Sequence, residues 1–272
     1  MSIIVEKHFD DLQEAEEVSV YPGKEDGLES HLAPCGSNTS WFGVRSGVAG
    51  VKKIVSEGWK DGAERIEELG QQIEVVKAKS IKRRTIRGAS GQTLNMSAVY
   101  SGNLSKCWTS RRRSGAIGPK KISILFQVGA NSDVDAERLF WRGAALAKVS
   151  EVLSEAGYSV QILGFSHTVG QFTPSGDTLY TFNIKGADES IDVHRLATIT
   201  ALAGYFRYYV FKIFHTAEQK LSYALGRAAS APAKLFDQLK PNHIISGFES
   251  INNLAAAQKF INDKINELEQ GA

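Results

Sequence analysis

Lysine and arginine side chains gather in one stretch of this sequence, and the chemistry they offer is anion binding. Residues 77–121 contain 12 basic and no acidic side chains, in a chain of 272 residues with 32 basic and 30 acidic ones. Because neutralising phosphates supplies much of a protein's affinity for nucleic acid, the stretch is a candidate nucleic-acid or anion-binding segment. Its candidate contact residues are Lys82, Arg83, Arg84, Arg87, Arg111, Arg112 and Arg113.

The same basic segment also has a second interpretation, which is electrostatic balance. Residues 1–76 carry 15 acidic and 7 basic side chains, so a solvated basic segment could offset their charge. Aromatic side chains, on which single-stranded bases stack, are sparse between residues 77 and 121, where only Tyr100 and Trp108 occur. The sequence leaves both interpretations open.

Residue patterns for catalysis are not found elsewhere in the chain. There is no glycine-rich phosphate loop, no G-x-S-x-G elbow and no H-E-x-x-H helix. Cys35 and Cys107 lie far apart without a neighbouring histidine cluster, which argues against a disulfide framework or a zinc site. His167, expected in a loop after a strand, and Cys107, beside Trp108, lack an assigned catalytic partner. We therefore predict no catalytic residues.

The elements that must position these residues form an alternating pattern from Lys121 onward. Apolar runs predict strands at Lys121–Gln127, Tyr158–Leu163, Leu179–Lys185 and His243–Phe248. Helical spacing predicts helices at 135–156 and 190–203 and one between Ile251 and Leu268. The alternation predicts an α/β fold, with a mostly parallel sheet and helices on both faces. Residues 121–164 predict one right-handed β-α-β crossover.

The part of the chain before Lys121 is expected to be added to this core. Residues 1–76 form an acidic N-terminal region, with a loose start, an acidic helix from His8 to Ser19 and two helices that pack on the core. Residues 77–120 form a basic connecting segment, with an exposed strand, a helical turn and a mobile loop at 110–121. In the helical turn, Val99, Tyr100 and Leu104 are expected to face inward. The aromatic run at 205–214 is expected on the surface.

Three pieces of the sequence resemble a known group of proteins. They are SWFGVRSGVAGVKKIVSEGWKDG at 40–62, SAVYSGNLSKCW at 97–108 and WRGAALAKVSEVLSEAGYSVQI at 141–162. The strand-loop-helix-strand containing the third piece resembles the start of a von Willebrand factor A-like domain. Together the pieces resemble an uncharacterised, largely phage-encoded family with a variant of that core, over most of residues 40–165. The resemblance implies a fold and a context, and no activity.

That resemblance raises the question of a metal site. A typical A domain carries Asp-x-Ser-x-Ser after its first strand, and its oxygens bind a divalent cation. Here the corresponding residues are QVGANSD at 127–133, with Gln127 or Gly129 in place of the first aspartate. Asn131, Ser132, Asp133 and Asp188 could contribute oxygens, but the missing carboxylate argues against Mg²⁺. We therefore predict no cofactor.

Three functions follow as expectations. The first is a non-enzymatic binding or assembly protein with a protein partner or self-association. The second is nucleic-acid binding through residues 77–121, and the third is an enzyme using the loops at 127–133, 165–178 and 186–190. The N-terminus turns acidic after four apolar residues, unlike a signal peptide, and no apolar run approaches about 20 residues. We expect no membrane association and a cytoplasmic location, in the host if the protein is phage-encoded.

Overall fold

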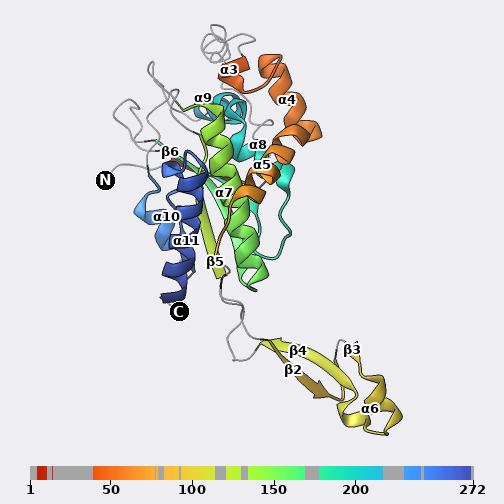
Figure 1. Ribbon diagram of the computed structural model, residues 1–272. Helices are drawn as coiled ribbons and strands as arrows, with labels where there is room; N and C mark the ends of the chain where they lie inside the picture. Colours follow the sequence, from red (N-terminus) through yellow and green to blue (C-terminus); the bar gives the residue numbers. More distant parts are fainter. Residues whose placement is uncertain are drawn as a thin grey trace.

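The structure is a computed structural model that describes residues 5–10, 14, 39–76, 78, 83–91, 93–113, 121–129, 134–168, 178–216, 230–239 and 242–270. Its strands form two sheets. A five-stranded sheet has the order β1-β7-β6-β5-β8, and a three-stranded sheet has the order β2-β4-β3. Figure 1 shows the first sheet inside a body of helices, and the second sheet apart from that body.

The five-stranded sheet is built around β5. Its strands are β1 (Val5–Phe9), β5 (Lys121–Gln127), β6 (Ser159–Thr168), β7 (Thr178–Lys185) and β8 (His243–Ile245). β5 runs parallel to β6 and β8, and β1 runs parallel to β7, whereas β6 and β7 are antiparallel. The predicted α/β class and mostly parallel sheet are therefore confirmed, as is the parallel β5–β6 unit connected by a helix.

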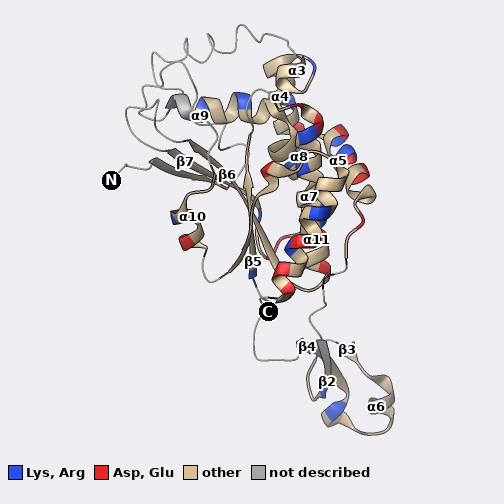
Figure 2. Cartoon of the chain, turned by 60° about the vertical axis from the view of Figure 1, so that its left-hand side comes forward, with Lys and Arg blue, Asp and Glu red and all other residues tan. Residues whose placement is uncertain are grey.

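Most helices cover one face of this sheet, and their apolar side chains form the main core with β5, β6 and β7. They are α4 (Gly47–Glu57), α5 (Lys60–Gln72), α7 (Ala136–Glu155), α8 (Val193–Ala201) and α11 (Leu254–Gln270), with shorter α3 (Thr39–Phe42) and the 3-10 helix η3 (Phe248–Ser250). On the opposite face, α10 (Ala233–Gln238) packs Leu235 against Leu125, Leu163, Phe165 and Leu179. The two faces are visible in Figure 2. Among the described residues, no helix is long and apolar enough to cross a membrane.

The N-terminal strand β1 differs from the expectation. We predicted a helix from His8, but His8 and Phe9 belong to an edge strand paired with Thr181 and Phe182. The Phe9 ring is buried and stacks on Phe182, with centroids 5.3 Å apart. The rest of the predicted helix lies outside the described residues, apart from Asp10 and Glu14. The five-stranded sheet thus takes strands from both sides of the basic segment.

The aromatic run expected on the surface lies in the core, so that expectation is wrong. The residues form a π-helix, η2 (Tyr205–Val210), followed by α9 (Phe211–Thr216). Tyr205 and Tyr209 are fully buried, and the Tyr205 ring meets the edge of Phe182 at 6.2 Å. The run contributes packing between η2 and the sheet rather than a partner surface. The helix expected from Ser190 begins at Val193, where the Asp192 side chain accepts the Arg195 N–H at 3.1 Å.

The basic segment folds into a small unit that we call the basic module, residues 83–113. Its strands are β2 (Arg83–Gly88), β3 (Thr93–Leu94) and β4 (Trp108–Arg113), joined by α6 (Met96–Tyr100) and the 3-10 helix η1 (Leu104–Lys106). The expected mobile loop is wrong over Ser110–Arg113, since these residues form β4, while 114–120 lie outside the described residues. Tyr100 and Leu104 are 82% and 64% exposed, so the expectation that they face inward is also wrong.

Candidate nucleic-acid interface

The antiparallel ladder between β2 and β4 brings the predicted arginines together. Arg83 pairs with Arg113, Arg84 with Arg112, Thr85 with Arg111 and Arg87 with Thr109. Because alternate residues of a strand lie on opposite faces, one face of the ladder holds four arginines and the other face holds two. The four are Arg83, Arg87, Arg111 and Arg113, and the two are Arg84 and Arg112. Lys82, the seventh predicted residue, lies outside the described residues.

The register of this ladder sets positively charged residues opposite one another. Like charges placed directly opposite each other destabilise an antiparallel pair, and here two such pairs are neighbours in the ladder. Residues 77–121 contain no Asp or Glu, so the segment itself provides no carboxylate to neutralise them. Guanidinium groups bind phosphate oxygens through two parallel hydrogen bonds.

The opposite end of the basic module carries exposed apolar residues, which we call the module tip. Leu94, Met96, Tyr100 and Leu104 are 39%, 47%, 82% and 64% exposed. Hydrogen bonds within the module fix the segment that carries these residues. The Asn95 N–H donates to the Cys107 carbonyl at 2.6 Å, and the Asn95 side chain accepts the Ala98 N–H at 3.4 Å, capping α6. Tyr100 is thus presented to solvent beside a basic sheet, where a base could stack on it.

The isolated candidates His167 and Cys107 have structural surroundings. His167 was expected in a loop, but it lies in β6, where it is buried and its Nδ1 hydrogen-bonds the Ser230 carbonyl at 2.7 Å. Cys107 is buried, and its thiol donates to the Leu104 carbonyl at 3.0 Å. Neither residue has a catalytic arrangement among the described side chains.

A polar relay that the sequence did not reveal lies beside a pocket on the α10 face. The pocket measures about 430 Å³ and is lined by His8, Gln161, Leu163, Leu179, Thr181, Leu235, Gln238 and Leu239. The imidazole of His8 lies 2.8 Å from the Thr181 hydroxyl through Nδ1 and 3.1 Å from Asp10 through Nε2. Because a carboxylate can only accept, Asp10 favours the proton on Nε2 and leaves Nδ1 to accept from Thr181. Only strand register brings His8 to Thr181.

The residues considered for a metal do not converge. Asn131, Ser132 and Asp133 lie outside the described residues. Asp188 follows β7, which runs antiparallel to β6, so Asp188 lies near the start of β6, where the Ser159 hydroxyl donates to the Ala187 carbonyl at 3.1 Å. Gln127 ends β5 at the opposite end of the strands, because Ser159 pairs with Lys121 at the start of β5. The described residues include no group of three or more His, Cys, Asp or Glu that could hold a metal ion.

A buried cation lies where an A domain would have its metal loop. Arg142, 3% exposed, donates from Nη2 to the Gln127 carbonyl at 3.0 Å and from Nη1 to the Gly129 carbonyl at 3.4 Å. Burial lowers the pKa of Arg142, and the nearby charge of Glu249 partly opposes that effect. A guanidinium bound to the two carbonyls at the end of β5 repels a divalent cation there, so the local chemistry does not fit Mg²⁺.

Comparison with known proteins gives the family of the chain. A family model described as a domain of unknown function, DUF7192, matches residues 3–266, a range that spans both sheets. No curated protein and no solved structure matches the chain. The chain therefore belongs to the DUF7192 family.

Proposed function

We propose that this protein is a non-enzymatic binding protein whose ligand is nucleic acid, with the α/β body as scaffold and the β2–β4 ladder as the phosphate-binding surface. The observation that carries the proposal is the direct pairing of Arg83 with Arg113 and Arg84 with Arg112, in a segment without carboxylates. A sheet that only had to fold would gain stability from opposite or neutral pairs. Cross-strand arginine pairs suit a surface that binds a polyanion, because the phosphates of the ligand neutralise the arginines.

The nucleic acid is expected to be recognised through its backbone rather than through its sequence. Arginines on a ladder contact backbone phosphates, which position a ligand but carry no sequence information. The exposed ring of Tyr100 adds a stacking surface that accepts any base. Binding is therefore expected to be strongly dependent on salt and tolerant of sequence.

The proposal extends to the fold of the scaffold, the origin of the protein and its location. The β5–α7–β6 unit supports a von Willebrand factor A-like body, in which Arg142 replaces the metal chemistry of the typical domain. We further propose that the protein is encoded by a phage. It would then act in the cytoplasm of the host cell, where nucleic acid is abundant.

Binding to labelled DNA and RNA oligonucleotides, followed by fluorescence anisotropy, tests the function. Each neutralised phosphate contributes a slope of about −0.7 to −0.9 to the dependence of log affinity on log salt. Arg111, Arg112 and Arg113, changed together to Ala, should weaken binding and make this slope shallower by about one to three, since Arg112 lies on the opposite face from the other two. The matched control removes three exposed charges from the body by changing Lys53, Lys60 and Lys259 to Ala. Equal losses in both variants, or affinity independent of salt, would overturn the proposal.

A second candidate function, acyl-ester hydrolysis, is favoured by the relay of Thr181, His8 and Asp10. In this chemistry the Thr181 hydroxyl oxygen attacks a carbonyl carbon, while its proton passes to His8 and then to the leaving alkoxide; water later releases the acyl group. A fluorophosphonate probe should label Thr181, and the label should disappear in His8→Ala while persisting in Thr93→Val. A protein that resists the probe, or is labelled elsewhere, removes this candidate.

A further inference from the structure

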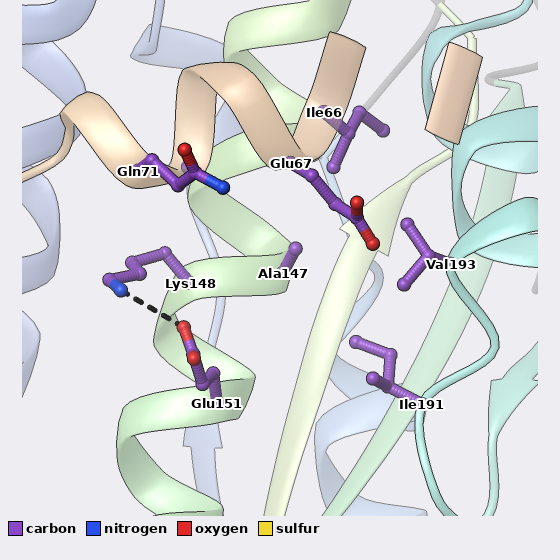
Figure 3. A pocket seen from close by; sticks show the side chains of 9 residues that line it. Ile66, Glu67, Gln71, Ala147, Lys148, Glu151, Ile191 and Val193 are labelled. Carbon is purple, nitrogen blue, oxygen red and sulfur yellow. Dashed lines mark hydrogen bonds and ion pairs between the residues drawn. The ribbon is translucent and has the colours of Figure 1, made fainter. Parts of the chain in front are cut away.

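A groove on the helical face of the body has both an apolar floor and an acidic rim. It lies between α5 and α7 and measures about 330 Å³. Ala147, Ile191 and Val193 provide half-buried apolar surface above the fully buried Ile66, and Glu67, Gln71, Lys148 and Glu151 provide the polar lining, as Figure 3 shows. Lys148, the one positive group among the described residues that line it, is paired with Glu151 at 3.0 Å.

The helices that line this groove carry further acidic residues. Glu67, Glu74 and Glu155 have no ion-pair partner among the described residues, and all three are exposed. They lie on α5, directly after it and at the end of α7. Figure 2 shows acidic residues, with basic residues among them, along these helices. An occupant of the groove would therefore need to combine apolar side chains with positive charge.

The basic module offers that combination. Among the described residues, five large apolar side chains are exposed, and four of them are the module tip: Leu94, Met96, Tyr100 and Leu104. Exposed apolar clusters mark interaction sites. The charge around the tip is positive, since Arg87 and Lys106 are exposed and residues 77–121 contain no carboxylate. The tip thus matches the groove in both apolar character and charge.

We propose that the module tip of one copy of this chain docks into the α5–α7 groove of a second copy. Both views of the structure place the module away from its own body, so its tip is free to reach another molecule (Figures 1 and 2). The contact joins two different surfaces, so it closes into a dimer if each copy gives its tip to the other, and otherwise continues as a chain. Docking of the tip does not require nucleic-acid binding by the arginines of the β2–β4 ladder, although Tyr100 belongs to both proposed surfaces.

Two variants separate the two halves of the contact. Tyr100→Ser with Leu104→Ser alters the tip at side chains that are mostly exposed, so the fold should be retained. Glu67→Lys with Glu151→Lys reverses the charge of the groove. The matched control is Val76→Ser, the exposed apolar residue outside the tip. Sedimentation velocity at several protein concentrations measures association, and circular dichroism confirms folding.

The wild type should associate with increasing concentration, and either double variant should weaken association at least ten-fold, while Val76→Ser should not. The decisive sample is an equal mixture of the tip and groove variants. It should associate again, because one variant keeps an intact groove and the other keeps an intact tip. A monomeric wild type at all concentrations, including one in which the tip folds back onto its own groove, would overturn the inference. So would a mixture that stays monomeric.

Discussion

Arg83 lies directly opposite Arg113 in the β2–β4 ladder, with Arg84 opposite Arg112 beside it. An antiparallel sheet gains roughly 0.2–1 kcal/mol from a favourable cross-strand pair and is destabilised by like charges in the same place. The register of the basic module therefore sets like-charged residues opposite each other at two consecutive positions. This relationship predicts that stability and anion binding respond in opposite directions to the same substitution.

The first prediction is that Arg113→Glu slows amide hydrogen exchange in the free basic module while weakening nucleic-acid binding. Its partner Arg83 would then face a carboxylate instead of a guanidinium, which should stabilise the ladder by up to about 1 kcal/mol. Hydrogen exchange of the β2 amides measures the local change. Arg87→Glu is the control, because it makes the same change of charge opposite Thr109, where no arginine lies directly opposite. If the two variants gain the same protection, cross-strand repulsion is not the cause.

The second prediction concerns the carboxyl end of β5, where the guanidinium of Arg142 is buried against two carbonyls. Millimolar Mg²⁺ and EDTA should give the same thermal unfolding temperature, because the guanidinium binds the Gln127 and Gly129 carbonyls and repels a cation. Arg142→Met should lower the free energy of unfolding by about 1–3 kcal/mol, because it removes a buried donor from the Gln127 and Gly129 carbonyls. An increase in unfolding temperature with Mg²⁺ in the wild type would contradict this account.

The third prediction compares two helical glycines. A methyl group at Gly143, in α7, would lie 2.7 Å from the Thr200 hydroxyl and 2.9 Å from Cδ1 of Ile66, so Gly143→Ala should destabilise the junction of α5, α7 and α8 by about 1–3 kcal/mol. At Gly70, in α5, a methyl group meets nothing within 4 Å. Gly70→Ala should therefore stabilise by about 0.4–1 kcal/mol through the unfolded chain. Urea unfolding distinguishes the two, and effects of the same sign would contradict the packing.

The parts of the fold that the sequence predicted are those specified by local pattern. β5 is a short apolar run, α7 has apolar residues at helical spacing, and Gly157 ends it with φ of 94°, as a left-handed terminus requires. Strand β1 has no comparable local signal, because its burial depends on β7, about 170 residues later. β4 was missed because an arginine run followed by Gly and Pro resembles a loop. Only its pairing with β2 makes it a strand.

The aromatic run at η2 contained a signal that could have been used. A helix that is apolar on all sides is buried in a core, and Tyr205, Tyr208, Tyr209 and Val210 surround the axis of η2. The cross-strand arginine pairs and the relay of His8 and Thr181 could not be derived in the same way. They depend on strand register, which the composition of a single strand does not determine. The candidate residues were predictable, but their juxtaposition was not.

The fourth prediction concerns stability at alkaline pH. Tyr180 is 1% exposed, and burial raises its pKa from 10.0 to about 12. Between these values the unfolded chain releases the phenol proton while the folded protein keeps it. The stabilisation from the neutral phenol is therefore complete below pH 10 and is lost as the pH rises toward about 12, at roughly 1.4 kcal/mol per pH unit.

Urea unfolding at several alkaline pH values checks this by comparing the wild type with Tyr180→Phe. The variant should lose less stability over this range by about 2–3 kcal/mol. Lys185 acts in the opposite direction, because burial lowers its pKa, and the free energy of unfolding therefore rises as its ammonium loses a proton. It is present in both proteins, so the difference between them isolates Tyr180. Tyr100→Phe, at a side chain 82% exposed, should follow the wild type. If Tyr180→Phe also follows it, the buried phenol is not the group that limits alkaline stability.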